Sequence, residues 1–287
     1  MKTIFASGIL FLAMAVAQAA TTIDGTNQFA YGANLGWVEW GGTTNGAVMG
    51  EYVCSGNIYS ANVGWINLGG GSPANFIQYQ NNSSTDFGVN MDSLGNLRGY
   101  AYGANIGWIN FETNGAPRVN LTTGQFSGYA YSANCGWISL SNSVALVQTY
   151  YLQPGVDANN DGIPDAWEYQ NFGTTNINVN ADPDGDGESN LQEYLAGTDP
   201  NNASSVLKIT GYSFPPGETS ATITWNSVLS RDYYLQAVQN LATTNWTDSS
   251  QGLIPPAGTT TMATATNTAA TMGFYRVLAV RPLLLNP

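Results

Sequence analysis

The residues with the clearest chemical character lie in two acidic loops between positions 157 and 193. Each loop has twelve residues, with oxygen-bearing side chains at its positions 1, 3, 5 and 9, a glycine at position 6 and a glutamate at position 12. Calcium takes about six to eight oxygen ligands, and a sharply turning loop can supply them from alternate positions. The residues expected to bind are Asp157, Asn159, Asp161, Ile163, Asp165 and Glu168 in the first loop, and Asp182, Asp184, Asp186, Glu188, Asn190 and Glu193 in the second.

The same pattern occurs twice, and this argues against a merely solvated acidic linker, which is the alternative interpretation. Gly162 and Gly187 permit the sharp turn, and each position-12 glutamate can offer two oxygens. Ile163 and Glu188 would bind through their backbone carbonyls. The sequence therefore predicts two bound Ca²⁺ ions.

Each loop is expected to run into a short helix, over 165–172 and 190–196, the second ending at Gly197. No amphipathic helix precedes either loop, so the loops are not paired EF-hands that open on binding. Residues 155–204 resemble the bacterial thrombospondin type 3 repeat, and this resemblance implies a rigid, calcium-stabilised connector. The weaker resemblance to dockerin is opposed by glutamate at position 12, where dockerin usually has aspartate.

Before the connector, one phrase of the form Tyr-x-Ala-Asn-x-Gly-Trp occurs four times, beginning at Tyr31, Tyr59, Tyr102 and Tyr131. The intervals between these four tyrosines are typical of repeat proteins, in which a single unit is too small to bury a hydrophobic core by itself. Residues 89–102 and 119–131 alternate apolar and polar residues around a turn and are expected to form hairpins. The repeat asparagines suit left-handed backbone angles in tight turns.

The repeat aromatic residues have two interpretations. They could stack on sugar rings, or they could fill the core of each unit. Because they recur in every repeat rather than at one location, we favour the interpretation that they are packing residues of the core. The repeat resembles the G-Y-A-W-S-x-N-x-G-W-I repeats of exported bacterial proteins, which implies location and fold rather than chemistry. The residues concerned are Tyr31, Trp37, Tyr59, Trp65, Tyr102, Trp108, Tyr131 and Trp137.

After the connector, residues 205–287 are expected to be all-β, with strands over 206–212, 221–226, 232–239, 259–266 and 273–280. The segment resembles a C-terminal immunoglobulin- or fibronectin-like sandwich of exported bacterial proteins. The expected fold class is mainly β, with a four-repeat β domain (20–148), a calcium-loop and helix connector (149–204) and a β-sandwich (205–287). The aromatic residues expected in the core of the C-terminal sandwich are Trp225, Tyr234, Trp246, Phe274 and Tyr275.

Composition narrows the function. The chain of 287 residues has 7 Lys+Arg, 19 Asp+Glu, no histidine and a net charge of −12. It lacks the clustered basic residues that bind nucleic acid or anionic lipid. It also lacks the histidine of a Ser-His-Asp or Cys-His unit. The carboxylates outside the two acidic loops show no local pairing of the kind that glycosidases use for acid and base catalysis. We expect that the protein is not an enzyme.

Residues 1–19 read as a secretory signal peptide, with an early lysine, an apolar run and the site Ala17-Gln18-Ala19. We expect an extracellular or cell-surface location with no membrane span. Cys54 and Cys135 would then meet an oxidising environment, and two cysteines permit one intramolecular disulfide.

The expected function is a secreted, calcium-binding structural protein that assembles with its own copies or with other surface proteins into a fibre or surface layer. Residues 20–30, or the tail after Arg281, would add a strand to a neighbour's sheet edge. The alternative is a carbohydrate-binding or adhesion module that uses the repeat aromatics to bind polysaccharide.

Overall fold

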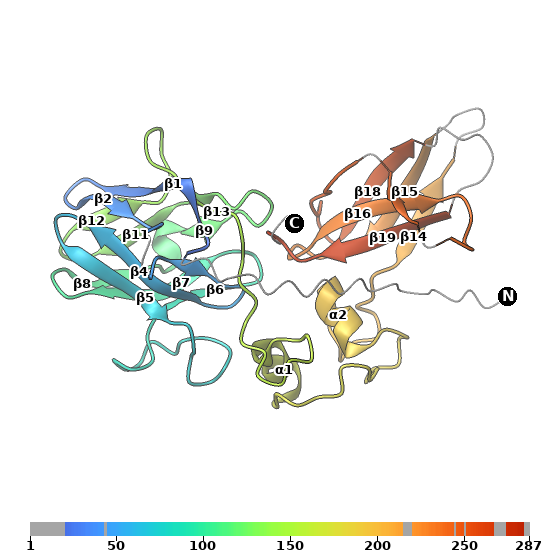
Figure 1. The fold of residues 1–287 in the computed structure, drawn as a ribbon, viewed down its shortest axis with the longest axis horizontal. Helices are drawn as coiled ribbons and strands as arrows, with labels where there is room; N and C mark the ends of the chain where they lie inside the picture. Colours follow the sequence, from blue (N-terminus) through green and yellow to red (C-terminus); the bar gives the residue numbers. More distant parts are fainter. Residues whose placement is uncertain are drawn as a thin grey trace.

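The computed structural model describes residues 21–42, 45–214, 220–243, 245–249, 251–266 and 274–283, and over these ranges the chain is mainly β (Figure 1). The expected fold class is confirmed. The predicted signal peptide and the last four residues of the tail lie outside the described ranges.

Eight strands of the repeat domain form a closed, barrel-like sheet. They pair in the order β1–β2–β4–β5–β7–β8–β11–β12, and β12 pairs again with β1. Their bounds are β1 Ile23–Gly32, β2 Gly36–Glu39, β4 Cys54–Ser60, β5 Gly64–Gly70, β7 Leu97–Gly103, β8 Gly107–Asn110, β11 Tyr129–Ser132 and β12 Gly136–Ser139. Shorter pieces accompany the ring: β3 Val48–Met49, β6 Val89–Met91, the 3-10 turn η1 Thr113–Gly115, β9 Arg118–Val119, β10 Phe126–Ser127 and β13 Val147–Thr149.

Each repeat phrase covers one hairpin of this ring. In all four hairpins the repeat tyrosine is paired with the repeat tryptophan across the strands. Both predicted hairpins are confirmed, because β6 pairs with β7 and β9 with β10. Because side chains alternate along a strand, the residue after each tryptophan points into the interior of the ring and is buried there. These residues are Val38, Ile66, Ile109 and Ile138.

The repeat asparagines connect neighbouring hairpins rather than adopting left-handed angles. Each asparagine donates its Nδ2 to the carbonyl of the residue after the neighbouring repeat's asparagine, and the four bonds close a circle. Left-handed angles occur instead at the glycine two residues later, as at Gly36 (φ 79°) and Gly64 (φ 82°). The bonds are Asn62 to Leu35 (2.9 Å), Asn105 to Val63 (2.9 Å), Asn134 to Ile106 (2.9 Å) and Asn34 to Cys135 (3.3 Å).

Closure of the ring bears on the expected strand donation, which stays a prediction. Most of residues 20–30 belong to β1, which already pairs with β2, β12 and β13 of the same chain. Donation of this strand to a neighbour would therefore break pairing within its own ring. The described part of the tail is also held, since Leu152 N donates to Leu283 O (3.2 Å) and the Leu283 side chain packs on the repeat-domain core.

The two cysteines are free thiols, and the disulfide that they permit is not formed. Cys54 is fully buried in β4, and Cys135 is partly buried against the same core. Aligned on the repeat tyrosine, Cys54 matches Leu97 and Phe126, and Cys135 matches Val63 and Ile106, so the two cysteines act as small apolar residues.

The C-terminal domain consists of two three-stranded sheets, in the orders β14–β15–β18 and β17–β16–β19. Their bounds are β14 Ile209–Ser213, β15 Ser220–Asn226, β16 Asp232–Val238, β17 Thr247–Asp248, β18 Thr260–Thr266 and β19 Phe274–Val280. All five expected strands are present, and β17 is an additional one.

Trp225 lies in the C-terminal core as expected, but three other expected core residues do not. Tyr233 is fully buried, whereas Tyr234 and Trp246 are half-buried and Phe274 is exposed. The one-residue error in β16 follows from strand alternation, because adjacent tyrosines must point to opposite faces. Tyr275 packs against the core.

Two helices lie in the connector, α1 (Asp165–Phe172) and α2 (Asn190–Ala196), with the bounds expected from the sequence (Figure 1). Ser189 and Gln192 form a capping box at the start of α2, and Gly197 ends it in a left-handed conformation (φ 76°). Ile163, Trp167 and Tyr194 form a small buried core between the helices, so each loop is anchored to a packed helix.

Candidate functional site

The two acidic loops are built by the same backbone turns. In each loop the aspartate at position 1 accepts a hydrogen bond from the glycine N–H at position 6: Gly162 to Asp157 and Gly187 to Asp182, both 3.0 Å. Both glycines have positive φ, 96° and 101°. The sharp turn expected at position 6 is therefore present in both loops, because only glycine adopts such angles without steric cost.

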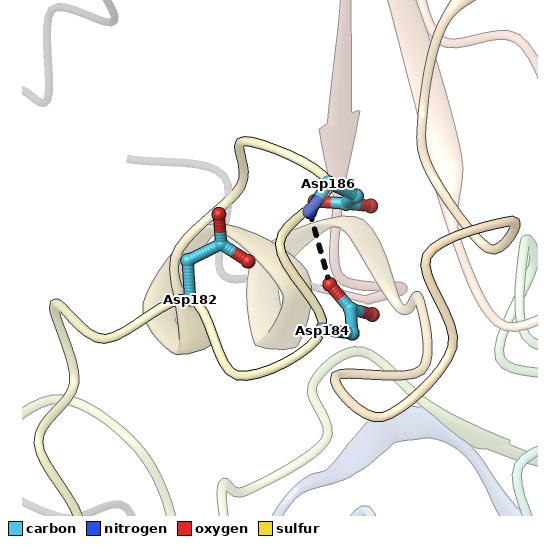
Figure 2. Close-up of side chains that lie close together, drawn as sticks. All are labelled: Asp182, Asp184 and Asp186. Atoms are coloured by element: carbon cyan, nitrogen blue, oxygen red, sulfur yellow. Dashed lines mark hydrogen bonds between the residues drawn. The ribbon is translucent and has the colours of Figure 1, made fainter.

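The second loop brings three carboxylates together. Asp182, Asp184 and Asp186 each offer an oxygen, and the three oxygens lie within 4.8 Å of one another (Figure 2). The N–H of Asp186 donates to Asp184 Oδ1 (3.2 Å), which fixes how the loop folds between them. Three carboxylates this close repel one another unless a cation lies between them.

Helix α2 adds two buried side chains to this loop. Glu193 is 0% exposed and Asn190 is 2% exposed. Within the described residues, both carboxylate oxygens of Glu193 and Oδ1 of Asn190 have no hydrogen-bond partner. The Nδ2 of Asn190 donates to Asn178 O (2.9 Å), which leaves its oxygen for another ligand. A buried carboxylate with no partner is costly, and a bound cation would compensate for that cost.

The pKa values of the loop glutamates also favour a cation at these positions. Burial, with the nearby charges of Asp184 and Asp186, raises the pKa of Glu193 to about 7, although the Thr198 side chain close to the carboxylate acts in the opposite direction. Burial also raises the pKa of Glu168 and of Glu188, with further contributions from neighbouring aspartates. These carboxyl groups are placed where a positive charge would stabilise their ionised forms.

The first loop is less well organised for a cation. Asn159 points its Nδ2 at Asp161 Oδ2 (2.9 Å), and Glu168 accepts a hydrogen bond from Ile177 N (3.0 Å). Asp165 and Glu168 are buried, and Glu168 Oε2 has no partner among the described residues. The side chain of Ile163 is fully buried and carries no donor atom, so an ion could be bound here only by its backbone carbonyl. Binding here would require Asn159 to present its oxygen instead.

A contact network beside the second loop was not expected from the sequence. Tyr194, which follows Glu193, lies between the side chains of Arg231 and Arg281 from the C-terminal domain. Its hydroxyl accepts from Arg281 (2.8 Å) and donates to Glu51 Oε2 (3.3 Å) in the repeat domain. Arg281 and Glu51 also form an ion pair (3.3 Å). No motif links these residues, because they come from three distant segments.

The repeat aromatics are on the outer surface, so the favoured core interpretation is wrong. The exposed fractions of the four tryptophans range from 47% to 54%, and those of the four tyrosines from 37% to 41%. Each Tyr–Trp pair has ring centroids 4.9–5.2 Å apart. The interior is filled instead by the aliphatic residues that follow, since only alternate residues of a strand face inward. The residues concerned are Tyr31, Trp37, Tyr59, Trp65, Tyr102, Trp108, Tyr131 and Trp137.

Comparisons with family models, with curated proteins and with solved structures found no match to the chain. Neither helix in the described part of the chain has the length and apolar character needed to cross a bilayer.

Proposed function

We propose that the chain is a secreted, calcium-binding structural protein whose two acidic loops stiffen the connection between two β domains. The observation that supports this most directly is Glu193, which is completely buried and whose two carboxylate oxygens have no partner in the described structure. It stands at position 12 of a loop that also gathers Asp182, Asp184 and Asp186.

The donor set favours calcium over other metals. All side-chain donors are carboxylate or amide oxygens, whereas zinc and copper sites in proteins usually include imidazole or thiolate ligands. The chain has no histidine, and Cys54 lies in the core of the repeat domain. Magnesium is usually held by one or two carboxylates and several waters, whereas a loop of alternating oxygen donors suits the higher coordination number of calcium.

Binding at the second loop would act directly on the junction between the domains. A cation held by Glu193 fixes the first turns of α2, and the next residue, Tyr194, contacts both β domains through Glu51, Arg231 and Arg281. At free calcium about 100-fold above Kd, binding to the folded state alone stabilises it by about 2.7 kcal/mol. For an extracellular module of this kind a Kd of about 10⁻⁴–10⁻³ M is expected.

The test is calcium titration of the purified chain by calorimetry, comparing Glu193→Gln with Glu188→Gln. Both changes remove one negative charge from the same loop, but only Glu193 is placed to bind through its side chain. We expect Glu193→Gln to weaken the tighter calcium site by at least about tenfold and Glu188→Gln to leave that site within about threefold.

Absence of calcium binding by the unaltered chain, or equal losses in the two variants, would reject the proposal. A chelator should also speed proteolysis within residues 155–204. Unchanged cleavage in that segment would show that calcium does not stiffen the connector.

Assembly of copies into a fibre or surface layer stays part of this proposal. Because β1 is already paired within its own ring, assembly through β1 would require that ring to open, whereas side-chain surfaces and the edge strands of the two C-terminal sheets are available without such a change.

A further inference from the structure

A cleft of about 650 Å³ lies beside the first Tyr–Trp pair of the repeat domain. One wall comes from β1 and β2 and includes Asn27, Phe29 and Trp37. The other wall is the loop between β12 and β13, with Asn142, Ser143 and Val144. The cleft is wide and largely open to solvent, and its volume is within the range of about 300–1,000 Å³ that is typical of small-ligand sites.

The aromatic wall is exposed and held in place. Trp37 is 49% exposed, and its ring makes edge contacts with Tyr31 (5.2 Å between centroids) and Phe29 (6.1 Å). Val144 in the opposite wall is 74% exposed. Aromatic rings fixed by their neighbours offer flat apolar faces and lose little conformational entropy on binding.

The polar groups in the cleft have unused hydrogen-bonding capacity. Asn142 uses its Oδ1 to accept from the N–H groups of Val144 and Ala145 (both 2.9 Å), which leaves its Nδ2 to donate. Asn27 donates its Nδ2 to Gln148 (2.8 Å), which leaves its Oδ1 to accept. The cleft thus pairs a donor and an acceptor with an apolar wall, the combination needed by a ligand that has hydroxyl groups on an apolar ring.

Charge narrows the class of ligand. None of the described residues that line the cleft is ionisable. Glu39 pairs with Phe29 across β1 and β2 and brings a negative charge next to this wall, in a chain of net charge −12. An anionic polymer would be repelled. We propose that this cleft binds a neutral pyranose sugar within a polysaccharide chain, with Trp37 against the sugar face.

The other three pairs have different surroundings, and these provide a control. Trp108 has Phe87 beside it (5.1 Å between centroids), and the Trp137 ring lies against Gly115. Trp65 is 54% exposed, and among the described residues its one ring contact is with Tyr59. Trp65 therefore has the same position in its hairpin as Trp37 but does not line this cleft.

The experiment measures retention of the full-length chain in native gels that contain a neutral polysaccharide: cellulose derivatives, β-1,3-glucan, starch, xylan, mannan or galactan. We expect retention by at least one of these polymers. Trp37→Ala should weaken that binding by at least about tenfold, Trp37→Phe should weaken it less, and Trp65→Ala should leave it unchanged. Trp37→Ala loses ring contacts with Tyr31 and Phe29, whereas Trp65→Ala loses one with Tyr59, so thermal unfolding of both variants is measured to verify that each is folded in the binding assay.

Each contrary result rejects the proposal. No retention by any of the six polymers would do so, and so would equal losses in Trp37→Ala and Trp65→Ala, which would assign binding to the exposed aromatics in general. Self-association that is lost only in Trp37→Ala, with no retention by a polymer, would assign the cleft to contact between copies of the chain.

Discussion

At the scale of single residues, Glu193 gives the metal-free protein a specific dependence on pH. Burial and the neighbouring aspartates raise its pKa from 4.5 to about 7 in the folded chain. Between these values the folded state binds more protons than the unfolded state, so the stability of the calcium-free protein falls as pH rises through this window.

The prediction is that the melting temperature in chelator decreases from pH 5 to pH 7.5 and that Glu193→Gln flattens this decrease. In saturating calcium the dependence should reverse, because the ion binds the ionised carboxylate and affinity increases with pH. Thermal unfolding at fixed ionic strength measures both curves. Identical curves with and without calcium would contradict the role given to Glu193.

The asparagine circle provides a second prediction at this scale. Replacing Asn62, Asn105 or Asn134 by alanine removes one hydrogen bond of 2.9 Å between neighbouring hairpins. Each change should lower the free energy of unfolding of the repeat domain by about 0.5–1.5 kcal/mol. Asn34→Ala should cost less, because its bond is longer, 3.3 Å. Urea denaturation measures the four values, and a larger loss for Asn34→Ala would be inconsistent with this ranking.

At the scale of elements, local patterns predicted much of the fold. The helices at 165–172 and 190–196 follow from loop and capping residues close by in the sequence, and the strands follow from alternation. The orientation of the repeat tryptophans could not be predicted in this way. Trp37 and Val38 are adjacent and both apolar, so the choice of the inward residue depends on closure of the ring, a long-range property.

The same limit applies to the candidate sites. The twelve proposed calcium ligands could be read from spacing, but the greater organisation of the second loop depends on packing of α2. The cleft beside Trp37 could not be predicted, because its walls lie about a hundred residues apart in the sequence and are brought together where β12 and β13 pair with β1.

Closure also gives a prediction about β1. Removing residues 23–32 takes away the partner of β2, β12 and β13, so the repeat domain should lose its cooperative unfolding transition. Near-UV circular dichroism and thermal unfolding should detect this loss. A synthetic peptide of residues 20–30 should not bind the intact chain, and tight binding of that peptide would support the strand-donation hypothesis.

At the scale of the whole molecule, Thr122 donates directly to Asp232 Oδ1 (3.3 Å) across the two β domains, and the polar contacts that run through α2 are concentrated at Tyr194. Arg231 donates to the carbonyls of Tyr194 (2.5 Å) and Leu195 (2.9 Å) at the end of α2. Positive charge at a helix C-terminus is favourable. Arg281 joins Tyr194 to Glu51, and both members of that ion pair are largely buried. Loss of one partner leaves the other charge buried and unpaired, which is strongly destabilising.

Arg281→Ala should therefore loosen the two β domains relative to each other while each stays folded. Small-angle X-ray scattering should show a larger radius of gyration than for the unaltered chain, and a chelator should produce a similar increase, because Glu193 and Tyr194 are adjacent on α2.

Arg276→Ala is the matched control. Arg276 belongs to β19, and it contacts Gln236 (2.8 Å) and the Trp246 ring (4.6 Å) within the C-terminal domain. An equal expansion in Arg276→Ala would show that the junction at Tyr194 does not set the arrangement of the domains. A larger radius of gyration in Arg281→Ala, with no change on adding chelator, would show that the contacts at Tyr194 hold the domains independently of calcium binding.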